Sequence, residues 1–382
     1  MKKSILITTI FSFMFFSSLQ VNAQDNADTK TRSFNVNKGG TLNISLNAGD
    51  VKITTWNKNE VSVKIVSEDK EEINKIFSSL ENNTVKISNK GNWGWGWTGD
   101  LIIYVSIPSE FNTEIKTQSG DVSQKGYLKG RANIFTAGGD ITIEDVSGQT
   151  VLKSNGGDIR TGNVDDDLTL STNGGDITTG NVKGKTIIST MGGSINVKNS
   201  GKDLNVNTMG GDIKIGDVGG KAEIKTMGGD ISVKNISGNG SISTYGGDIT
   251  LSGAKGLIEA TTYGGDIRMN NITGSVKLDT KSGDIYLELN PSGNNQSEIK
   301  TMNGGIKLIL PANAKAEIKA TARDRGFGKY NNSDQNIISD FDSKTFVTDD
   351  RKNETQATYL INGGGNGIEL FSINGTIEIR KK

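Results

Sequence analysis

The tetrapeptide Gly-Gly-Asp-Ile recurs through the middle of this chain with a constant step, the step that separates Asp140 from Asp158. Its aspartates are Asp140, Asp158, Asp176, Asp212, Asp230, Asp248, Asp266 and Asp284, and Ser194 occupies the one remaining position. A constant period of this length is typical of stacked-repeat proteins, in which each unit buries its apolar face against the next. We therefore treat one such 18-residue step as a coil and number positions within a coil from the aspartate, which is position 0.

Apolar and polar residues alternate within the coil, which indicates strands rather than helix. Position +1 is always Ile, and position +3 is mostly β-branched or aliphatic. Asn or Asp usually occupies +5 and Gly is common at +8, as expected of a turn. A second strand follows, with apolar residues at +10 and +12 and Ser or Thr at +14, and the Gly-Gly pair then closes the coil. Because Gly has no Cβ, it suits a tight corner that is repeated in register.

These features predict an all-β fold, a single-stranded parallel β-helix built of 18-residue coils. A left-handed hexapeptide solenoid can have coils of the same length, but it needs an inward aliphatic residue at every sixth position. Here the inward set falls at +1, +3, +6, +10 and +12, so we favour a right-handed or flattened solenoid. The pattern of inward positions does not by itself establish the handedness of the solenoid.

The segment 1–23 has the order of a secretory signal peptide. Lys2 and Lys3 precede an apolar stretch from 5 to 16, and small residues allow cleavage between Ala23 and Gln24. The apolar stretch is too short to span a membrane. We therefore predict an exported protein that is periplasmic, on the outer surface or secreted.

The rest of the chain divides by composition and pattern. Residues 24–32 are polar and predicted to be disordered. Residues 33–115 are predicted to form an N-terminal β cap, in which Gly49-Asp50-Val51 is an early copy of the motif and 68–80 is a short amphipathic helix that covers the end of the solenoid. Residues 116–290 form the regular coils. Residues 291–382 form C-terminal coils interrupted by a long polar excursion at 321–358.

Composition excludes several classes of function. The chain has no His and no Cys, which removes Ser-His-Asp and Cys-His nucleophiles, disulfides and the usual zinc, copper and haem ligands. Loss of Lys2 and Lys3 with the signal takes 43 basic residues to 41 against 43 acidic ones, so neither a nucleic-acid footprint nor a basic membrane patch is expected. We expect no cofactor and no enzymatic activity.

The column of aspartates raises the question of a metal site. Stacked carboxylates about 5 Å apart repel one another by roughly 1 kcal/mol even in water, so each needs compensation. We predict a structural role, in which backbone N–H groups of the Gly-Gly-Asp corner donate to the side chain, as in an Asx-turn. Calcium binding is the alternative, although calcium-binding Gly-rich repeats are shorter and carry more Asp.

Two apolar groups are candidates for contact with a partner. Position +15 carries Met191, Met209, Met227, Tyr245 and Tyr263, and strand alternation predicts that these side chains point outward. They could form a recognition surface, or they could stack only to stabilise the corner. Trp93, Trp95 and Trp97 lie together between the N-terminal strands. We favour a hydrophobic lid over the first coil for these rings and keep an aromatic platform as the alternative.

Several motifs together resemble a known family. They are the early Gly-Asp-Val strand, Ile107-Pro108, the repeated Gly-Gly-Asp-Ile coils, the segment Gly-Gly-Ile-Lys-Leu-Ile-Leu-Pro at 304–311 and the closing Asn-Gly-Thr-Ile-Glu-Ile. This combination is similar to the bacterial putative-adhesin family of β-strand-repeat domains of unknown function, over nearly the whole mature chain. The resemblance implies a β-helix and an envelope or extracellular location, and it supplies no catalytic residues.

Three functions are compatible with these observations. We favour a non-catalytic adhesion scaffold at the surface or in the periplasm, in contact with an unidentified glycan or protein. The alternative is a ligand-free structural or regulatory envelope protein. A β-helix carbohydrate-active enzyme is disfavoured, because its acid and base carboxylates would have to gather in one cleft. The carboxylates of this chain are instead spread evenly along the repeat.

Overall fold

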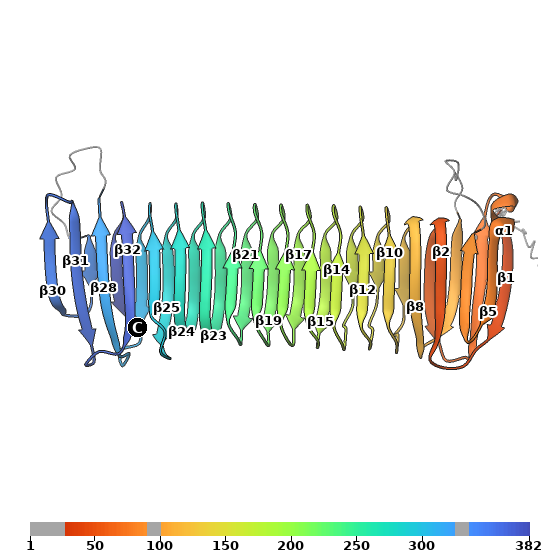
Figure 1. Cartoon of the computed structure of the whole chain (residues 1–382), viewed down its shortest axis with the longest axis horizontal. Helices are drawn as coiled ribbons and strands as arrows, with labels where there is room; N and C mark the ends of the chain where they lie inside the picture. Colours follow the sequence, from red (N-terminus) through yellow and green to blue (C-terminus); the bar gives the residue numbers. More distant parts are fainter. Residues whose placement is uncertain (1–26, 90–100, 325–335) are drawn as a thin grey trace, which may run out of the picture.

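A computed structural model describes residues 27–89, 101–324 and 336–382. These residues are almost entirely β: one sheet of 33 strands winds into a long, nearly closed, solenoid-like rod (Figure 1). The signal segment, the junction between Ala23 and Gln24, and the three clustered tryptophans lie outside the described residues. No helix in the described part of the chain has the length and apolar character needed to cross a membrane.

Each coil contributes one strand to each of two rows that run along the rod. The first row holds the strands at +1 to +3, namely β9 (Val122–Lys125), β11 (Ile141–Ile143), β13 (Ile159–Thr161), β15 (Ile177–Val182), β17 (Ile195–Ser200), β19 (Ile213–Val218) and β21 (Ile231–Ile236). The second row holds the strands at +10 to +14, namely β8 (Phe111–Ser119), β10 (Ala132–Thr136), β12 (Thr150–Ser154), β14 (Leu168–Ser171), β16 (Thr186–Ser189), β18 (Leu204–Asn207), β20 (Ala222–Lys225) and β22 (Gly240–Ser243). Two longer strands, β23 (Ile249–Thr262) and β24 (Ile267–Thr280), pass through both rows.

Neighbouring strands of a row are parallel and differ by one repeat. Ile177 pairs with Ile195, which in turn pairs with Ile213, so equivalent positions of successive coils lie side by side. The inward positions predicted from the sequence are buried, as Ile177 and Leu204 illustrate with 0% and 2% exposure. Stacking of identical side chains along the rod thus produces a continuous apolar core, one coil thick.

A buried hydroxyl at +14 connects successive corners. In one coil Thr244 Oγ1 donates to the carbonyl of Gly229 at 2.9 Å and accepts from the N–H of Gly247 at 3.2 Å. The same pair of bonds recurs from Thr136 to Thr262. This explains why only Ser or Thr occurs at a position that otherwise faces the apolar core, since a buried backbone group without a partner is costly.

The N-terminal end of the rod continues both rows with mixed strand directions. The first row adds β3 (Asp50–Trp56), β7 (Ile102–Pro108), β4 (Glu60–Ser67) and β1 (Asp28–Asn35). The second row adds β2 (Gly40–Ala48), β6 (Thr84–Asn89) and β5 (Ile76–Glu81). The helix α1 (Lys70–Lys75) lies at this end beside β1, β4 and β5 (Figure 1).

Two predictions for this end are wrong. The helix ends at Lys75 rather than at residue 80, because Ile76–Glu81 pairs with β6, extends the sheet and buries Ile76 and Ser78. The second error concerns residues 28–32, which were predicted to be disordered but belong to β1. They are held by pairing with β4, and Arg32 also donates to the carbonyl of Ser78 at 3.0 Å.

The C-terminal end contains a change of chain order. After β25 (Ile285–Pro291), β26 (Ser297–Thr301) and β27 (Ile306–Leu310), the next segments form β28 (Ala316–Arg323), β29 (Ile337–Ser339), β30 (Ser343–Asp349) and β31 (Glu354–Ile361). The last strands, β32 (Asn366–Ile373) and β33 (Ile377–Lys381), then insert between β26 and β28 and between β27 and β29. The described parts of 321–358 therefore form strands that extend the rod, and the prediction of a long polar excursion there is wrong. In β31, for example, Ala357 and Tyr359 are buried at alternating positions.

The second Gly of each pair is predicted to be far less replaceable than the first. A Cβ on Gly247 would overlap the carbonyl of Gly229 in the preceding coil, whereas one on Gly246 would lie 3.3 Å from the nearest atom. We expect Gly247→Ala to destabilise the protein by about 2 kcal/mol or more, because the obstacle is backbone that cannot rotate away. The control Gly246→Ala should change the melting temperature much less. Equal melting of the two variants would contradict this account of the corner.

Candidate functional site

The aspartate column forms a series of hydrogen bonds between coils, with a gap after Ser194, which has no carboxylate to accept from the next coil. Asp230 Oδ1 accepts from the backbone N–H of Asp248 at 2.8 Å, and Asp248 Oδ1 accepts from that of Asp266 at the same distance. The series begins at Asp50, which accepts from the N–H of Asp121, and ends at Gly305, which donates to Asp284. The other bonds of this type join Asp121 to Asp140, Asp140 to Asp158, Asp158 to Asp176, Asp176 to Ser194, Asp212 to Asp230 and Asp266 to Asp284.

This geometry gives the aspartates a structural role, but the backbone N–H groups that donate to them are not those of the same Gly-Gly-Asp corner, as was predicted. Each carboxylate accepts from the next coil rather than from its own turn, so the bonds hold coils in register instead of shaping one corner. Asp50, recognised as an early copy of the motif, is the first acceptor of the series. Among the described residues no three carboxylates gather in a group that could hold a metal ion.

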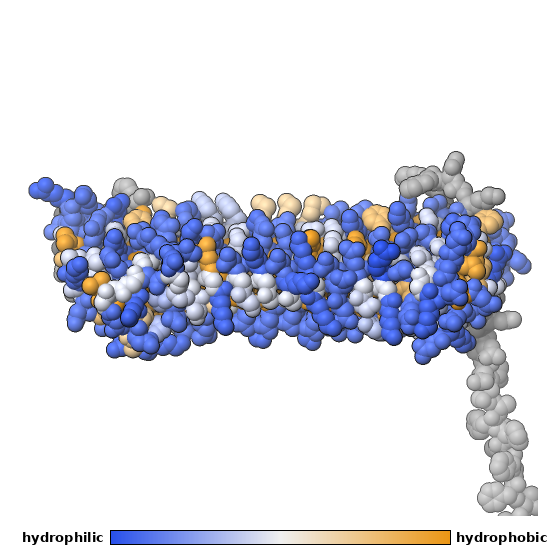
Figure 2. Space-filling model, turned by 60° about the horizontal axis from the view of Figure 1, so that its bottom comes forward, coloured by the Kyte–Doolittle hydropathy of each residue, from blue (hydrophilic) through white to orange (hydrophobic). Residues whose placement is uncertain are grey.

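The +15 column forms an exposed apolar strip on the same corner. Met191, Met209, Met227, Tyr245 and Tyr263 are 50 to 61% exposed, which confirms that they point outward. We call these five residues the Met/Tyr strip. In Figure 1 the corners that follow the second-row strands align along one edge of the rod, and Figure 2 shows pale orange side chains projecting along a long edge above a mainly hydrophilic face.

The two tyrosines of the strip stack on each other. Their ring centroids lie 4.8 Å apart and the ring planes differ by 5°. The ring faces between them are therefore covered, and this part of the strip presents ring edges and hydroxyl groups to solvent. Such a surface suits adaptable contact with a partner better than insertion of a sugar ring between the two tyrosines.

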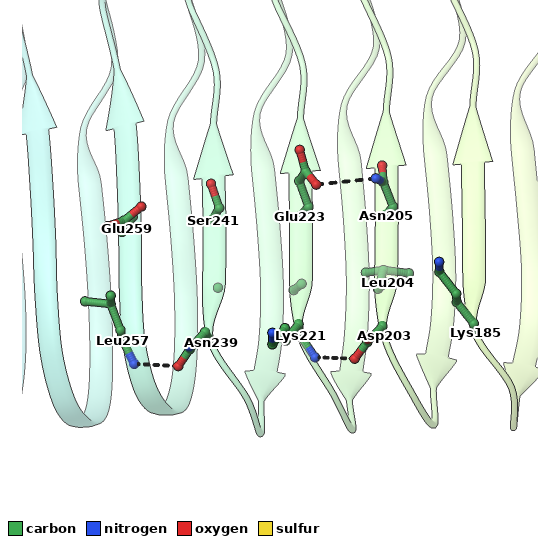
Figure 3. A pocket seen from close by; sticks show the side chains of 12 residues that line it. Lys185, Asp203, Leu204, Asn205, Lys221, Glu223, Asn239, Ser241, Leu257 and Glu259 are labelled. Atoms are coloured by element: carbon green, nitrogen blue, oxygen red, sulfur yellow. Dashed lines mark hydrogen bonds between the residues drawn. The ribbon is translucent and has the colours of Figure 1, made fainter. Parts of the chain in front are cut away.

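A shallow groove on the outer side of the second row was not predicted from the sequence. It has a volume of about 420 Å³ and lies over β18, β20 and β22 (Figure 3). Ala222 and Gly240 line it at position +10, where the flanking coils carry Leu204 and Ile258. Position +10 faces the core, where Ile236 and Ile258 adjoin Gly240, so these small residues do not predict a hollow on the outer side.

The carboxylates of the groove are already engaged with protein partners. Asp203 Oδ1 accepts from the N–H of Lys221 at 2.9 Å, and Asn205 donates to Glu223 at 3.4 Å (Figure 3). Glu223 also pairs with Lys225 at 2.6 Å, and Glu259 pairs with Lys277 at 3.0 Å. These exposed, paired carboxylates lack the desolvated environment that tunes catalytic acids and bases. The groove is thus suited to contact rather than to chemistry.

Comparison with known proteins assigns the chain to a family. The family model described as Toastrack DUF4097 matches residues 39–215, 161–340 and 258–380, which overlap and together span most of the chain. The protein belongs to the Toastrack DUF4097 family. This confirms the resemblance to a bacterial putative-adhesin family of unknown function. No curated protein matches the Toastrack chain.

Solved structures similar to this Toastrack protein include several described as adhesion proteins. A putative adhesin from Bacteroides fragilis is 13% identical and has a TM-score of 0.25, with coverage of 93% of this chain and 97% of that one. A putative adhesin from Parabacteroides merdae is 15% identical, with a TM-score of 0.34 and coverage of 67% and 95%. A putative cell adhesion protein from Clostridium sporogenes is 11% identical, with a TM-score of 0.18 and coverage of 93% and 100%.

The hydrogen bonds of the aspartate column predict that the acceptor oxygen matters and the charge does not. Asp230→Asn keeps an oxygen for the N–H of Asp248, whereas Asp230→Ala removes it. We expect the Ala variant to melt about 2 °C lower and the Asn variant to melt within that margin of wild type. Calcium and a chelator should leave all three melting temperatures unchanged. A large rise with calcium, lost in the Asn variant, would contradict the structural role.

Proposed function

We propose that this Toastrack protein is a non-catalytic scaffold of the cell envelope that makes adhesive contacts through the Met/Tyr strip. The observation that carries the proposal is the exposure of five consecutive apolar or aromatic side chains, each at least half accessible to solvent. Contiguous apolar surface of this kind commonly marks an interaction site. The partner is a protein or glycan surface that can lie along the edge of a rod.

The corner does not need apolar residues at the strip positions. The same position +15 carries Asn155 and Asn173 in earlier coils and Lys281 in a later one, and all of these coils have the same strand pairing. Each of these corners has the second Gly, the +14 hydroxyl and the aspartate, and Ser282 replaces the first Gly after Lys281. The choice of Met and Tyr in the five central coils is therefore better explained by contact with a partner than by stability.

A second function is a ligand-free structural or regulatory envelope protein. The stacking of Tyr245 on Tyr263 supports it, because like side chains that contact each other stabilise the rod without any ligand. We propose no catalytic role: the aspartates of the column bond to backbone N–H groups, and the carboxylates of the groove already have partners.

The architecture proposed with this function is a parallel β-helix of 18-residue coils. Residues 33–115 would form its N-terminal cap, in which α1 covers part of the open end, 116–290 its regular shaft, and 291–382 its C-terminal coils. The parallel register of one repeat between successive strands supports this description. A right-handed path is the form that the inward pattern favours.

Export is a prediction of the proposed function. The basic, apolar and small-residue order of residues 1–23 leads us to expect cleavage after Ala23 and a mature protein that begins at Gln24. N-terminal sequencing of the native protein from separated cell fractions measures this directly. Material in the cytoplasm that retains Met1 would rule out an envelope function.

Replacement of four strip residues tests the contact surface itself. We expect a variant with Met209, Met227, Tyr245 and Tyr263 all changed to Ser to lose most binding to whole cells and glycan arrays, about tenfold or more, with little change in melting temperature. The control changes Ile187 and Tyr104, which are exposed elsewhere on the rod, to Ser. Unchanged binding with a marked loss of stability would instead support the ligand-free function.

A further inference from the structure

One tyrosine lies at the N-terminal end of the polar column at position +5, in the place of an Asp or Asn. This position carries Asp145, Asn163, Asn181, Asn199 and Asp217 in successive coils, whose side chains bond to one another or to backbone N–H groups. Leu128 pairs with Val146, so the residue before it, Tyr127, occupies the place in register with Asp145. In a protein built of repeats, a residue that breaks a column without serving the stack is a candidate for function.

The ring of Tyr127 is held in a fixed orientation across two coils. Its hydroxyl donates to Asp165 Oδ2 at 3.0 Å, and Lys183 Nζ lies 2.8 Å from Asp165 Oδ1. The bond to Lys183 lowers the pKa of Asp165, and the bond to Asp165 raises the pKa of the phenol, so at neutral pH the hydroxyl keeps its proton and remains the donor. The ring is thereby oriented before any ligand arrives, although 42% of the residue is exposed.

Two hollows adjoin Tyr127. One of about 450 Å³ is lined by Tyr127, Glu144, Arg160 and Gly162, among others, and one of about 320 Å³ by Tyr127, Asn163 and Lys183, among others. Gly162 lines the first at position +4, where its backbone approaches Asp145 of the coil before so closely that a Cβ would overlap the carboxylate. The ring therefore has open space beside it, unlike the mutually stacked tyrosines of the strip.

The polar groups around the ring supply both donors and acceptors. Glu144 accepts from the N–H of Gly126 at 2.6 Å and keeps further lone pairs. The two cations nearest the ring are each paired with a carboxylate, Arg160 with Asp158 at 2.7 Å and Lys183 with Asp165. A flat apolar ring bordered by charge-balanced polar groups matches a sugar, which has an apolar face and a rim of hydroxyls.

We propose that Tyr127 is the stacking platform of a saccharide-binding subsite for a neutral sugar ring, which lies in the hollow lined by Glu144, Arg160 and Gly162. The pairing of both cations with carboxylates disfavours an anionic sugar, because the hollow then offers no uncompensated positive charge. This subsite is separate from the Met/Tyr strip, since it lies on the +5 corner of the coil and the strip on the +15 corner. It adds a location that the proposed function does not contain and names the ligand as a neutral sugar ring.

The experiment titrates the exported full-length chain with hexamers of glucose, galactose, mannose, xylose and N-acetylglucosamine, followed by NMR and calorimetry. We expect at least one neutral hexamer to bind and to show magnetisation transfer between its ring protons and those of Tyr127. Tyr127→Ala should weaken that binding about tenfold or more, and Tyr127→Phe, which keeps the ring, should weaken it less. The matched control is Tyr104→Ala, whose 41% exposure is nearly the same and which should bind like wild type.

Three results would overturn the subsite: no hexamer binds the wild-type protein, the Tyr127→Ala variant binds as tightly as wild type, or binding occurs without transfer to the Tyr127 ring. The transfer measurement is made on the wild-type protein, so it decides the matter even if the Ala variant fails to fold. The four-residue strip variant separates this proposal from the previous one. It should keep hexamer binding if the subsite is real, whether or not the strip mediates adhesion.

Discussion

The close approach of backbones at the glycine corner is the constraint on which the rest of the rod depends. The second Gly of a pair lies so near the corresponding carbonyl of the preceding coil that a Cβ would overlap it. This close approach allows two side chains to bond to the corner. The buried Thr hydroxyl donates to a Gly carbonyl of one corner and accepts from a Gly N–H of the next, and the Asp carboxylate accepts from a backbone N–H of the following coil. Three residue types thus satisfy the corner internally. The repeat length stays constant because the Asp bond and the Thr bond to the Gly carbonyl each join a corner to the adjacent one.

The hydrogen bonds that hold a corner are made by its Gly, Thr and Asp residues, so the outward positions of the coil are free to vary. Position +15 can be Asn, Met, Tyr or Lys, and position +5 can be Asp, Asn or Tyr, with the same strand pairing beneath. In a compact domain such changes would disturb neighbours on several sides, but in a solenoid a residue contacts only nearby coils. The Met/Tyr strip and Tyr127 are both departures of this kind, on different corners of the same shaft.

The two ends of the rod must cover or pair their edge strands, because the last strand of a row has unpaired backbone N–H and C=O groups. At the N-terminal end Lys30 and Arg32 donate to the carbonyls of Ile76 and Ser78, which covers part of the edge of β5 with basic side chains. At the C-terminal end the chain adds antiparallel strands and then returns to insert β32 and β33 within the rod. The final residues are thereby paired on both sides rather than placed at the edge.

The sequence by itself determined the strands, the inward Ile and Thr columns and the outward Met/Tyr strip, because all of these follow from a local alternation repeated at a fixed period. The tertiary structure decided what depends on which segments become neighbours. The carboxylate of Asp230 accepts from the next coil rather than from its own turn, and the strand at Ile76 ends a helix that the local spacing would continue. Tyr127 escaped prediction because the step from Asp121 to Asp140 is one residue longer than the regular repeat, so counting by the repeat does not bring it into register with Asp145. These three features depend on non-local strand pairing, which no local sequence pattern encodes.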